Sequence, residues 1–432
     1  MTARIIRQLG LAAGALAIFV AAPARAGMGD GIRLGGGEGV LHPFFEIASE
    51  YDTNVYAEKG GQGDLIFHFR PGVKVDVPGD MVAIDGRAAL ERVQYLGMGT
   101  DTADISGWWG DAGLRLSVNP KGRVGFELRE AFRRSNQVQA LSLTMPALSN
   151  YNMLSATVPF MPGGGALIFA LGGDWAIEGY EPLGGEGVCS TDPVLASDPY
   201  CSTAILKKLG YTDLQGRGSA IWKFLPRTQA TLDVGYSQRI PNETDPAAAG
   251  YSPRVGTLRA LAGLSGLVTT QFGATIRAGY GATSATGANV GTWLATVEGE
   301  WIPVAEASVK AGYSHGVGTE PGALYAVFST NRLSLDAQYK VARRYTAKLG
   351  VRYDMLAYQV SQNDSTASIL NVEPALGAEA AKWLHVDVGY SFTRRDTNFK
   401  VTATTPTGAP VTEPETFDFS RSLIYLRASV IY

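Results

Sequence analysis

The C-terminal segment alternates strictly between two kinds of position. Counting back from the last residue, every second side chain is apolar, namely Tyr432, Val430, Ala428, Leu426 and Ile424. The positions between them are mostly polar or mixed. Successive side chains of a β-strand point to opposite faces, so the segment is predicted to be a strand with one lipid-facing and one water-facing side.

The five apolar residues of this segment end in an aromatic carboxy-terminal residue, Tyr432. This pattern resembles the assembly signal of bacterial outer-membrane barrels and implies the barrel-assembly machinery as a partner.

The same alternation recurs along the chain, so it is the main constraint on the fold. It is found in residues 65–76, 272–280, 307–314, 333–340, 347–354 and 384–393. A soluble β-sandwich also alternates, but it needs a second apolar layer and rarely has so many similar strands with Tyr or Trp at their ends. The predicted fold class is therefore all-β, a transmembrane antiparallel β-barrel of the bacterial outer membrane, in contact with outer-membrane lipids.

Short and long connections interleave, which is a second property of such barrels. Eight short turns are expected at residues 78–80, 119–122, 162–165, 225–227, 269–270, 303–305, 341–344 and 380–383. Nine long loops are expected at residues 53–63, 97–105, 135–150, 181–203, 241–253, 283–291, 316–322, 361–367 and 398–415. These 17 connections join 18 strands, with 16 as the alternative if one early strand is miscounted. An even count places both termini in the periplasm and the long loops outside the cell.

Composition agrees with a two-faced strand. Charged residues are 18% of the chain and the net charge is −3, which excludes a nucleic-acid binder that relies on positive charge and a highly charged disordered chain. Gly contributes 53 of 432 residues, above the usual level of about 7%. The mean hydropathy of +0.01 is the average expected of alternating lipid-facing and water-facing side chains.

The N-terminal segment is predicted to be a cleaved secretory signal, residues 1–26. Arg4 and Arg7 precede an apolar stretch at residues 9–22, and Ala24-Arg25-Ala26 provides a cleavage site. A membrane anchor is the alternative, but this stretch is shorter than the roughly 20 residues that a spanning helix needs. No later stretch is long and apolar enough for a membrane helix. Residues 27–432 are expected to form a single barrel domain, integral to the outer membrane.

Cys189 and Cys201 are predicted to form a disulfide within the loop at residues 181–203. An even cysteine count in an exported protein favours a disulfide. Two thiols without a nearby His do not complete a metal site, and no cofactor is expected.

A barrel of 16 to 18 strands is wide enough to leave an aqueous lumen. The candidate lumen-lining residues are Arg70, Lys74, Arg277, Lys310, Lys348, Arg352, His385, Asp387, Arg395, Arg421 and Arg427. Acidic positions such as Asp76, Glu127, Asp233, Glu298 and Asp354 alternate in the same way. Because these side chains carry both positive and negative charge, they predict a hydrated inner surface without an ion preference. The alternative for any one of these residues is a cross-strand pair that only stabilises the barrel.

Most of the seven tryptophans fall near expected strand ends, where they anchor a barrel at the membrane interface. Trp108 and Trp109 are adjacent and must point to opposite faces. One of them is therefore available to line the lumen.

The chain is predicted not to be an enzyme. Barrels that resemble outer-membrane phospholipases place His and Ser two residues apart on one strand face, because nucleophile and base must lie within hydrogen-bond reach. Here the residues two positions after His42, His68, His315 and His385 are Phe44, Arg70, Val317 and Asp387. No P-loop, dinucleotide fingerprint or HExxH motif is present either.

The mature N-terminal region resembles a bacterial family of outer-membrane β-barrel porins. The resemblance rests on residues 31–35, 43–47, 51–56, 64–67 and 70–72, which include a Tyr-Asp-x-Asn segment and a strand with an Arg-Pro-Gly sequence. Members of this family occur beside polysaccharide export systems. The resemblance implies a conduit for an exopolysaccharide or capsule-like chain, working with a periplasmic polysaccharide export protein.

Three functions remain open from the sequence. The first is this polysaccharide conduit, the second is a general diffusion porin for small hydrophilic solutes, and the third is a structural or adhesive barrel with a plugged lumen. A long loop folded into the lumen would favour the porin, and the best candidate is the loop at residues 181–203.

Overall fold

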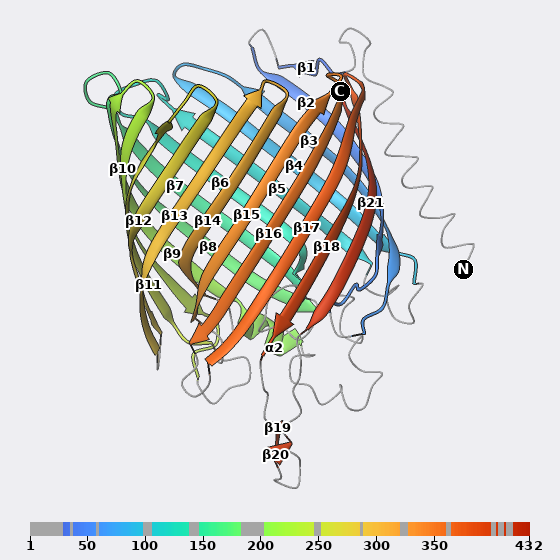
Figure 1. The fold of residues 1–432 in the computed structure, drawn as a ribbon. Helices are drawn as coiled ribbons and strands as arrows, with labels where there is room; N and C mark the ends of the chain where they lie inside the picture. Colours follow the sequence, from blue (N-terminus) through green and yellow to red (C-terminus); the bar gives the residue numbers. More distant parts are fainter. Residues whose placement is uncertain are drawn as a thin grey trace.

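The computed structural model describes residues 29–34, 38–57, 60–97, 106–137, 147–182, 203–245, 252–285, 288–319, 327–359, 364–398, 403–404, 410–411 and 418–432. Eighteen long strands in this part of the chain form one barrel (Figure 1). The predicted signal peptide at residues 1–26 lies outside the described residues, and so do Cys189 and Cys201. In the described part, no helix is long and apolar enough to cross a membrane.

The barrel strands follow one another in chain order. They are β2 (Val40–Asp52), β3 (Asp64–Val77), β4 (Val82–Tyr95), β5 (Gly107–Val118), β6 (Phe126–Gln137), β7 (Ala147–Phe160), β8 (Leu167–Pro182), β9 (Tyr211–Leu225), β10 (Thr228–Pro241), β11 (Val255–Leu267), β12 (Phe272–Ala285), β13 (Ala288–Val304), β14 (Ala307–Thr319), β15 (Val327–Val341), β16 (Tyr345–Gln359), β17 (Asp364–Ala381), β18 (Leu384–Thr397) and β21 (Phe419–Ile431). The short elements are β1 (Ile32–Arg33), α2 (Thr203–Leu209), β19 (Ala403–Thr404) and β20 (Pro410–Val411).

The barrel closes where the last long strand meets the first. β21 pairs antiparallel with β2 from Phe44↔Ile431 to Asp52↔Leu423, and every other long strand pairs antiparallel with its neighbours in sequence. β1 pairs with Val40 and Leu41 of β2, just beyond the point where the β21 pairing stops. The amide of Tyr432 donates to the carbonyl oxygen of Pro43 at 2.9 Å. The predicted count of 18 strands is confirmed, and the alternative of 16 is wrong.

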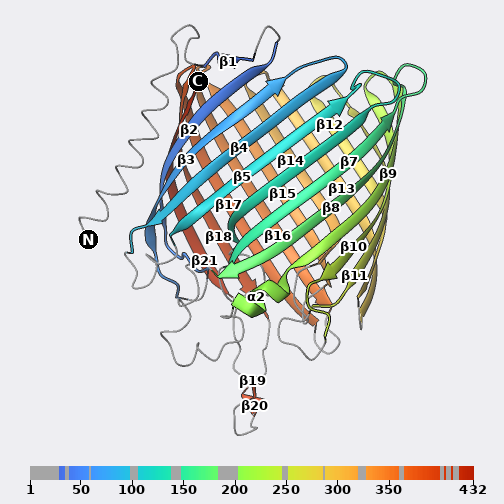
Figure 2. The same ribbon diagram turned by 180° about the vertical axis from the view of Figure 1, so that it is seen from behind.

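The two ends of the barrel differ as the sequence predicted. The eight short turns join β3 to β4, β5 to β6, and so on to β17 and β18, and the C-terminus lies at this short-turn end (Figures 1 and 2). The other connections lie at the opposite end, called here the long-loop end. One expected long loop, residues 283–291, is mostly strand, because β12 and β13 stay paired up to Ala285↔Ala288.

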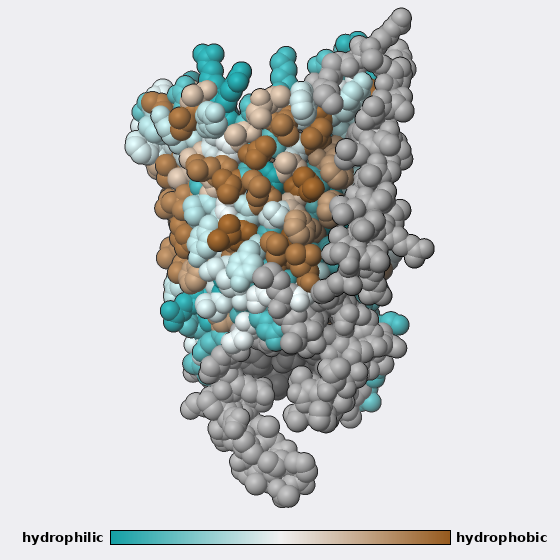
Figure 3. Space-filling view, turned by 90° about the vertical axis from the view of Figure 1, so that its right-hand side faces the viewer, coloured by the Kyte–Doolittle hydropathy of each residue, from teal (hydrophilic) through white to brown (hydrophobic). Residues whose placement is uncertain are grey.

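Along each strand, alternate side chains point to the outer surface of the barrel and into its lumen. On β10, Leu232, Val234 and Tyr236 are 45–51% exposed on the outer face, while Asp233 and Arg239 line a cavity inside. A space-filling view shows apolar residues around the middle of the barrel and hydrophilic residues towards both ends (Figure 3). Exposed aromatic residues such as Trp301 and Trp293 lie near the two ends of one strand, β13. This is the side-chain distribution that a lipid bilayer requires of a barrel.

Most fully buried side chains lie towards the long-loop end. One cluster contains Val55, Ile66, Val93 and Tyr95, and three further clusters lie near the same rim. Closer to the short turns, inward side chains are open to solvent. Lys310, for example, has a 62% exposed side chain. Among the described residues, the lumen is therefore wider at the short-turn end than at the long-loop end.

Candidate functional site

The helix α2 lies against the inner face of the barrel. It belongs to the connection between β8 and β9, and its Leu206 and Leu209 are 3% and 1% exposed. Both pack in one cluster with Ala147, Tyr180 and Tyr211, which belong to the inward-facing residues of β7, β8 and β9. Figure 2 shows α2 at the long-loop end, beside the end of β8. This helix therefore narrows the mouth of the lumen.

Buried polar side chains fix the surface on which α2 rests. The Glu178 carboxylate, 5% exposed, accepts hydrogen bonds from Ser149 Oγ at 2.6 Å and from the Tyr211 hydroxyl. The Arg239 guanidinium lies 3.8 Å from the centre of the Tyr211 ring and donates to both Asp213 oxygens at 2.9 and 3.0 Å. Buried polar groups paired in this way hold a single arrangement, because breaking any one pair leaves an unsatisfied group.

A second segment, the end of the β14–β15 hairpin, also turns into the lumen. The β13–β14 pairing ends at Ala295↔His315, whereas β14 and β15 stay paired as far as Thr319↔Val327. Beyond His315 the hairpin therefore leaves the barrel wall. Its Val317 and Val327 pack with Val255 and Val290, which are inward-facing residues of β11 and β13.

Two arginines, on β10 and β11, donate hydrogen bonds to carbonyl oxygens of this hairpin. Arg259 on β11 donates to the Val317 oxygen at 3.2 Å, and Arg239 on β10 donates to the Thr319 oxygen at 3.4 Å. Bonds from charged donors are stronger than those between neutral groups. The inward position of the hairpin is thus secured by apolar packing and by these two bonds.

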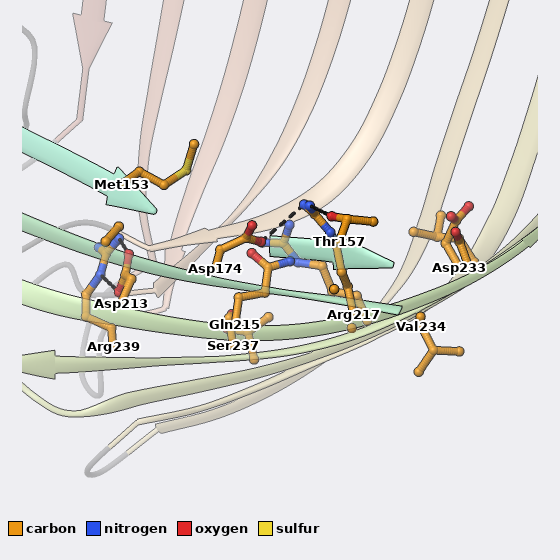
Figure 4. Close-up of a pocket in the computed structure, with 18 of the residues that line it drawn as sticks. Met153, Thr157, Asp174, Asp213, Gln215, Arg217, Asp233, Val234, Ser237 and Arg239 are labelled. Carbon is orange, nitrogen blue, oxygen red and sulfur yellow. Dashed lines mark hydrogen bonds and ion pairs between the residues drawn. The ribbon is translucent and has the colours of Figure 1, made fainter. Parts of the chain in front are cut away.

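A cavity of about 600 Å³ lies along the inner wall beside these two segments. It is lined by β7 to β11 and by Thr319, and Figure 4 shows side chains from several strands converging on it. Arg217 pairs with Asp174 at 3.1 Å and donates to the hydroxyls of Ser155 and Thr157 at 3.1 and 3.0 Å. The cavity therefore offers closely spaced donors and acceptors with nearly balanced charge.

A separate network of charges lines β2 to β5. Arg70 pairs with Asp111 and, at 3.2 Å, with Glu46. His68 lies 2.6 Å from Glu91 and 3.2 Å from Glu50. Arg87 also lies 3.8 Å from Glu46 and 3.8 Å from Asp111, so two arginines and His68 share the four carboxylates of this network.

The predicted lumen residues are distributed around the whole wall rather than gathered in one site. All eleven lie at inward-facing positions of their strands, since they alternate with exposed apolar side chains. Several of them pair with a carboxylate: Lys310 with Glu300 at 3.2 Å, Arg352 with Asp354 at 3.4 Å, His385 with Asp387 at 3.0 Å and Arg421 with Asp52 at 2.8 Å. Lys74 lies 5.4 Å from the centre of the Phe44 ring, and Arg427 lies 5.5 Å from the centre of the Tyr425 ring. Arg395 is 5% exposed. In the described part of the chain, no carboxylate lies within ion-pair distance of Arg277 or Lys348. A role for these residues in contact with a transported solute stays a prediction.

The residues that shape the narrowed mouth were absent from the predicted set. Arg217, Arg239, Arg259 and Asp213 follow the same alternation as the residues that were named, and applying the pattern across β9 to β11 would have found them. Of the tryptophan pair, Trp108 is 53% exposed on the outer face, and Trp109 packs inside against the cluster around Val93. Within the described ranges, no group of three or more His, Cys, Asp or Glu residues is placed to hold a metal ion.

These features define a class of protein. Each of the 18 long strands pairs with a neighbour on both sides, the outer belt is apolar and the inner wall is polar, which is the construction of an integral membrane β-barrel of the outer-membrane type. The apolar belt would be unfavourable in water and is the surface that such a membrane covers.

Comparison with known proteins returns barrels of low sequence identity. OpdK of Pseudomonas aeruginosa, solved with vanillate, is 10% identical, with 91% of this chain and 99% of that chain covered and a TM-score of 0.46. OccK3 (OpdO) of the same species is 11% identical, with 90% of this chain and 96% of that chain covered and a TM-score of 0.46. The FrpB iron transporter of Neisseria meningitidis is 7% identical, with 90% of this chain and 81% of that chain covered and a TM-score of 0.43. No family model matches the chain, and no curated protein matches it. The porin-family resemblance of residues 31–76 stays a prediction.

Proposed function

We propose that the protein is an outer-membrane channel for small hydrophilic solutes. The observation that carries this proposal is the narrowed mouth: α2 and the end of the β14–β15 hairpin both pack against the inner wall of an otherwise wide 18-stranded barrel. A segment folded inward restricts the size of what passes while the rest of the lumen stays hydrated. The connection that contains α2 is the one that the sequence singled out as the candidate constriction.

The charge pattern favours uncharged, hydroxyl-rich solutes over strongly charged ones. Arg217 and Arg239 at the cavity are each paired with an aspartate at about 3 Å, so the field of each cation is largely cancelled. The same pairs still present hydrogen-bond donors and acceptors that replace water around a sugar. We therefore expect weak selectivity between anions and cations.

Export of a polysaccharide is the second candidate, and one observation favours it. Inward charges continue around the wall and down to the open short-turn end, where Lys310 and Glu300 are 62% and 43% exposed. A hydrated chain delivered by a periplasmic export protein would enter there. In that case α2 and the hairpin must move aside to let the polymer leave.

The test of the channel is conductance of the purified full chain in planar bilayers, together with swelling of liposomes in sugar solutions. The double variant Leu206→Ala/Leu209→Ala removes the buried side chains that anchor α2, so we expect a higher conductance and faster uptake of larger sugars. Lys207→Ala is the matched control, because Lys207 is exposed on the same helix. Absence of conductance in every variant would contradict the channel. Loss of secreted polysaccharide in a deletion strain, together with a closed channel in vitro, would support the second candidate instead.

A further inference from the structure

Three side chains form a row on the outer surface of the barrel at the long-loop end. Arg92 on β4 is the cross-strand partner of Trp108 on β5, and its guanidinium lies 5.6 Å from the centre of the Trp108 ring. On the other side, Arg134 on β6 donates from Nε to the Trp108 carbonyl oxygen at 3.2 Å. All three belong to the outward-facing residues of their strands, as shown by the exposed Leu90, Leu114 and Phe132 of the same face. We call Arg92, Trp108 and Arg134 the arginine row.

The arginine row keeps uncompensated positive charge. Arg92 donates to the Gln94 side-chain oxygen at 3.2 Å, and no carboxylate of the described residues lies within ion-pair distance of it. Arg134 pairs with Glu181 at 2.9 Å and donates to Asn150 at 2.6 Å. Among the described residues, one of the two positive charges is thus neutralised by a carboxylate, and the charge of Arg92 faces outwards without one.

An apolar groove of about 390 Å³ opens on the outer surface next to the row. Leu90, Trp108 and Phe132 form its sides, and the small residues Ala88, Gly110 and Ala112 lie between them. Arg134 is part of the same lining. The groove lies on the face that the membrane covers, so its occupant there is a lipid chain.

We propose that the arginine row and this groove bind one outer-leaflet lipid whose headgroup carries phosphate. The long-loop end of such a barrel faces outside the cell, which places the row at the headgroups of the outer leaflet. Guanidinium groups bind phosphate oxygens through paired N–H donors, and Arg92 is available for this. The acyl chain of the same lipid fills the groove below, where the small residues leave room for it.

The barrel provides a matched control for the charge. Arg394 on β18 also points outwards at the long-loop end, but Asp396 binds its Nε and Nη2 at 2.9–3.1 Å. An arginine with its own carboxylate gains little from a second anion. Arg394→Gln should therefore leave lipid binding unchanged, whereas Arg92→Gln should weaken it.

The experiment is native mass spectrometry of the full, delipidated chain in detergent, titrated with bisphosphorylated lipid A, phosphatidylcholine or inorganic phosphate. We expect one lipid A per chain, retained more strongly than phosphatidylcholine, and an affinity about tenfold lower in Arg92→Gln, the change expected for a charged hydrogen bond of about 1.4 kcal/mol. Ala112→Leu, which fills the groove without altering charge, should also weaken retention. Folding of each variant is checked by its heat-modifiable band on gels.

Two results would overturn the proposal. One is equal retention of lipid A by the unmodified chain, Arg92→Gln and Ala112→Leu when all three are folded. The other is binding of inorganic phosphate as strong as that of the lipid, which would show a headgroup site that makes no use of the groove. Neither result bears on conductance, so the channel proposal is tested separately.

Discussion

Arg259 on β11 donates a hydrogen bond from Nη2 to the carbonyl oxygen of Val317 on β14, at 3.2 Å. Two strands, β12 and β13, lie between them in the barrel order, so the bond is possible only because the β14–β15 hairpin end leaves the wall and turns inward. A strand end that stayed in the wall would pair with β13 instead. This bond and the valine contacts beside it are what hold the hairpin over the lumen.

Removing this arginine should widen the channel. In Arg259→Ala the Val317 carbonyl loses a charged donor, a loss of about 1.5–3 kcal/mol for bonds of this kind, and the hairpin should spend more time away from the lumen. We expect a higher single-channel conductance, and a larger increase when Arg239→Ala is added. Arg277→Ala on the neighbouring strand is the control, since Arg277 makes no hydrogen bond or ion pair with the described residues of the hairpin. Unchanged conductance in the double variant would show that the valine packing alone sets the opening.

Arg421 should be important for closure of the barrel. Its Nε donates to Asp52 Oδ2 at 2.8 Å, and Asp52 is fully buried at the seam between β2 and β21. Arg421→Ala leaves this carboxylate buried without its cation, which costs about 3–5 kcal/mol in comparable cases. The temperature at which the folded gel band converts to the unfolded one should fall clearly, and much less in Arg427→Ala on the same strand. Adding Asp52→Asn to Arg421→Ala should restore part of the loss.

Glu130 is an ionisable side chain on the lipid-facing surface. It is exposed, and its cross-strand partners Leu114 and Leu154 are themselves 49% and 37% exposed on the outer face. A carboxylate facing hydrocarbon is unfavourable, although less so than Arg or Lys at the same depth. Glu130→Leu should therefore raise the free energy of unfolding in lipid vesicles by about 1 kcal/mol. Leu154→Glu should lower it, and a fall in Glu130→Leu would indicate that another molecule covers this carboxylate.

Acid should loosen the tether of α2. Lys208 Nζ lies 2.8 Å from Glu243 Oε2, and this ion pair, with the Asp245 amide, holds the pKa of Glu243 below its usual value of 4.5. A lowered pKa means that the pair stabilises the docked helix above pH 4.5, and that this contribution is lost as the pH falls through the lowered pKa. Conductance measured from neutral to acid pH should rise only in that range. In Glu243→Gln the conductance should already be raised at neutral pH, and it should change less than in the unmodified chain when the pH is lowered.

The strand order and the short turns were predictable because their signals are local. The Pro162 to Gly165 turn is an example: Gly163, Gly164 and Gly165 all have positive φ, a conformation that glycine adopts without strain. Alternation likewise assigns each residue of β21 to one face without any knowledge of its neighbours.

The narrowed mouth was not predictable from the same patterns. Alternation gives the face of a side chain but not its depth or the segment that covers it. Val317 and Val327 are apolar like many strand residues, and only their contact with Val255 and Val290 shows that the hairpin turns inward. Leu206 and Leu209 likewise bury themselves on tyrosines that precede and follow them in the chain.

The closing pair of strands also sets when this protein can fold. The ring nitrogen Nδ1 of His42 lies 3.1 Å from the carbonyl oxygen of Tyr432, a partner 390 residues later in the chain. During synthesis, β2 is made first among the long strands but must wait for nearly all the others before it gains its second neighbour. Contacts so distant in sequence form slowly, and an unclosed sheet has two free edges that invite aggregation. The nascent chain therefore depends on being kept unfolded until the last strand arrives.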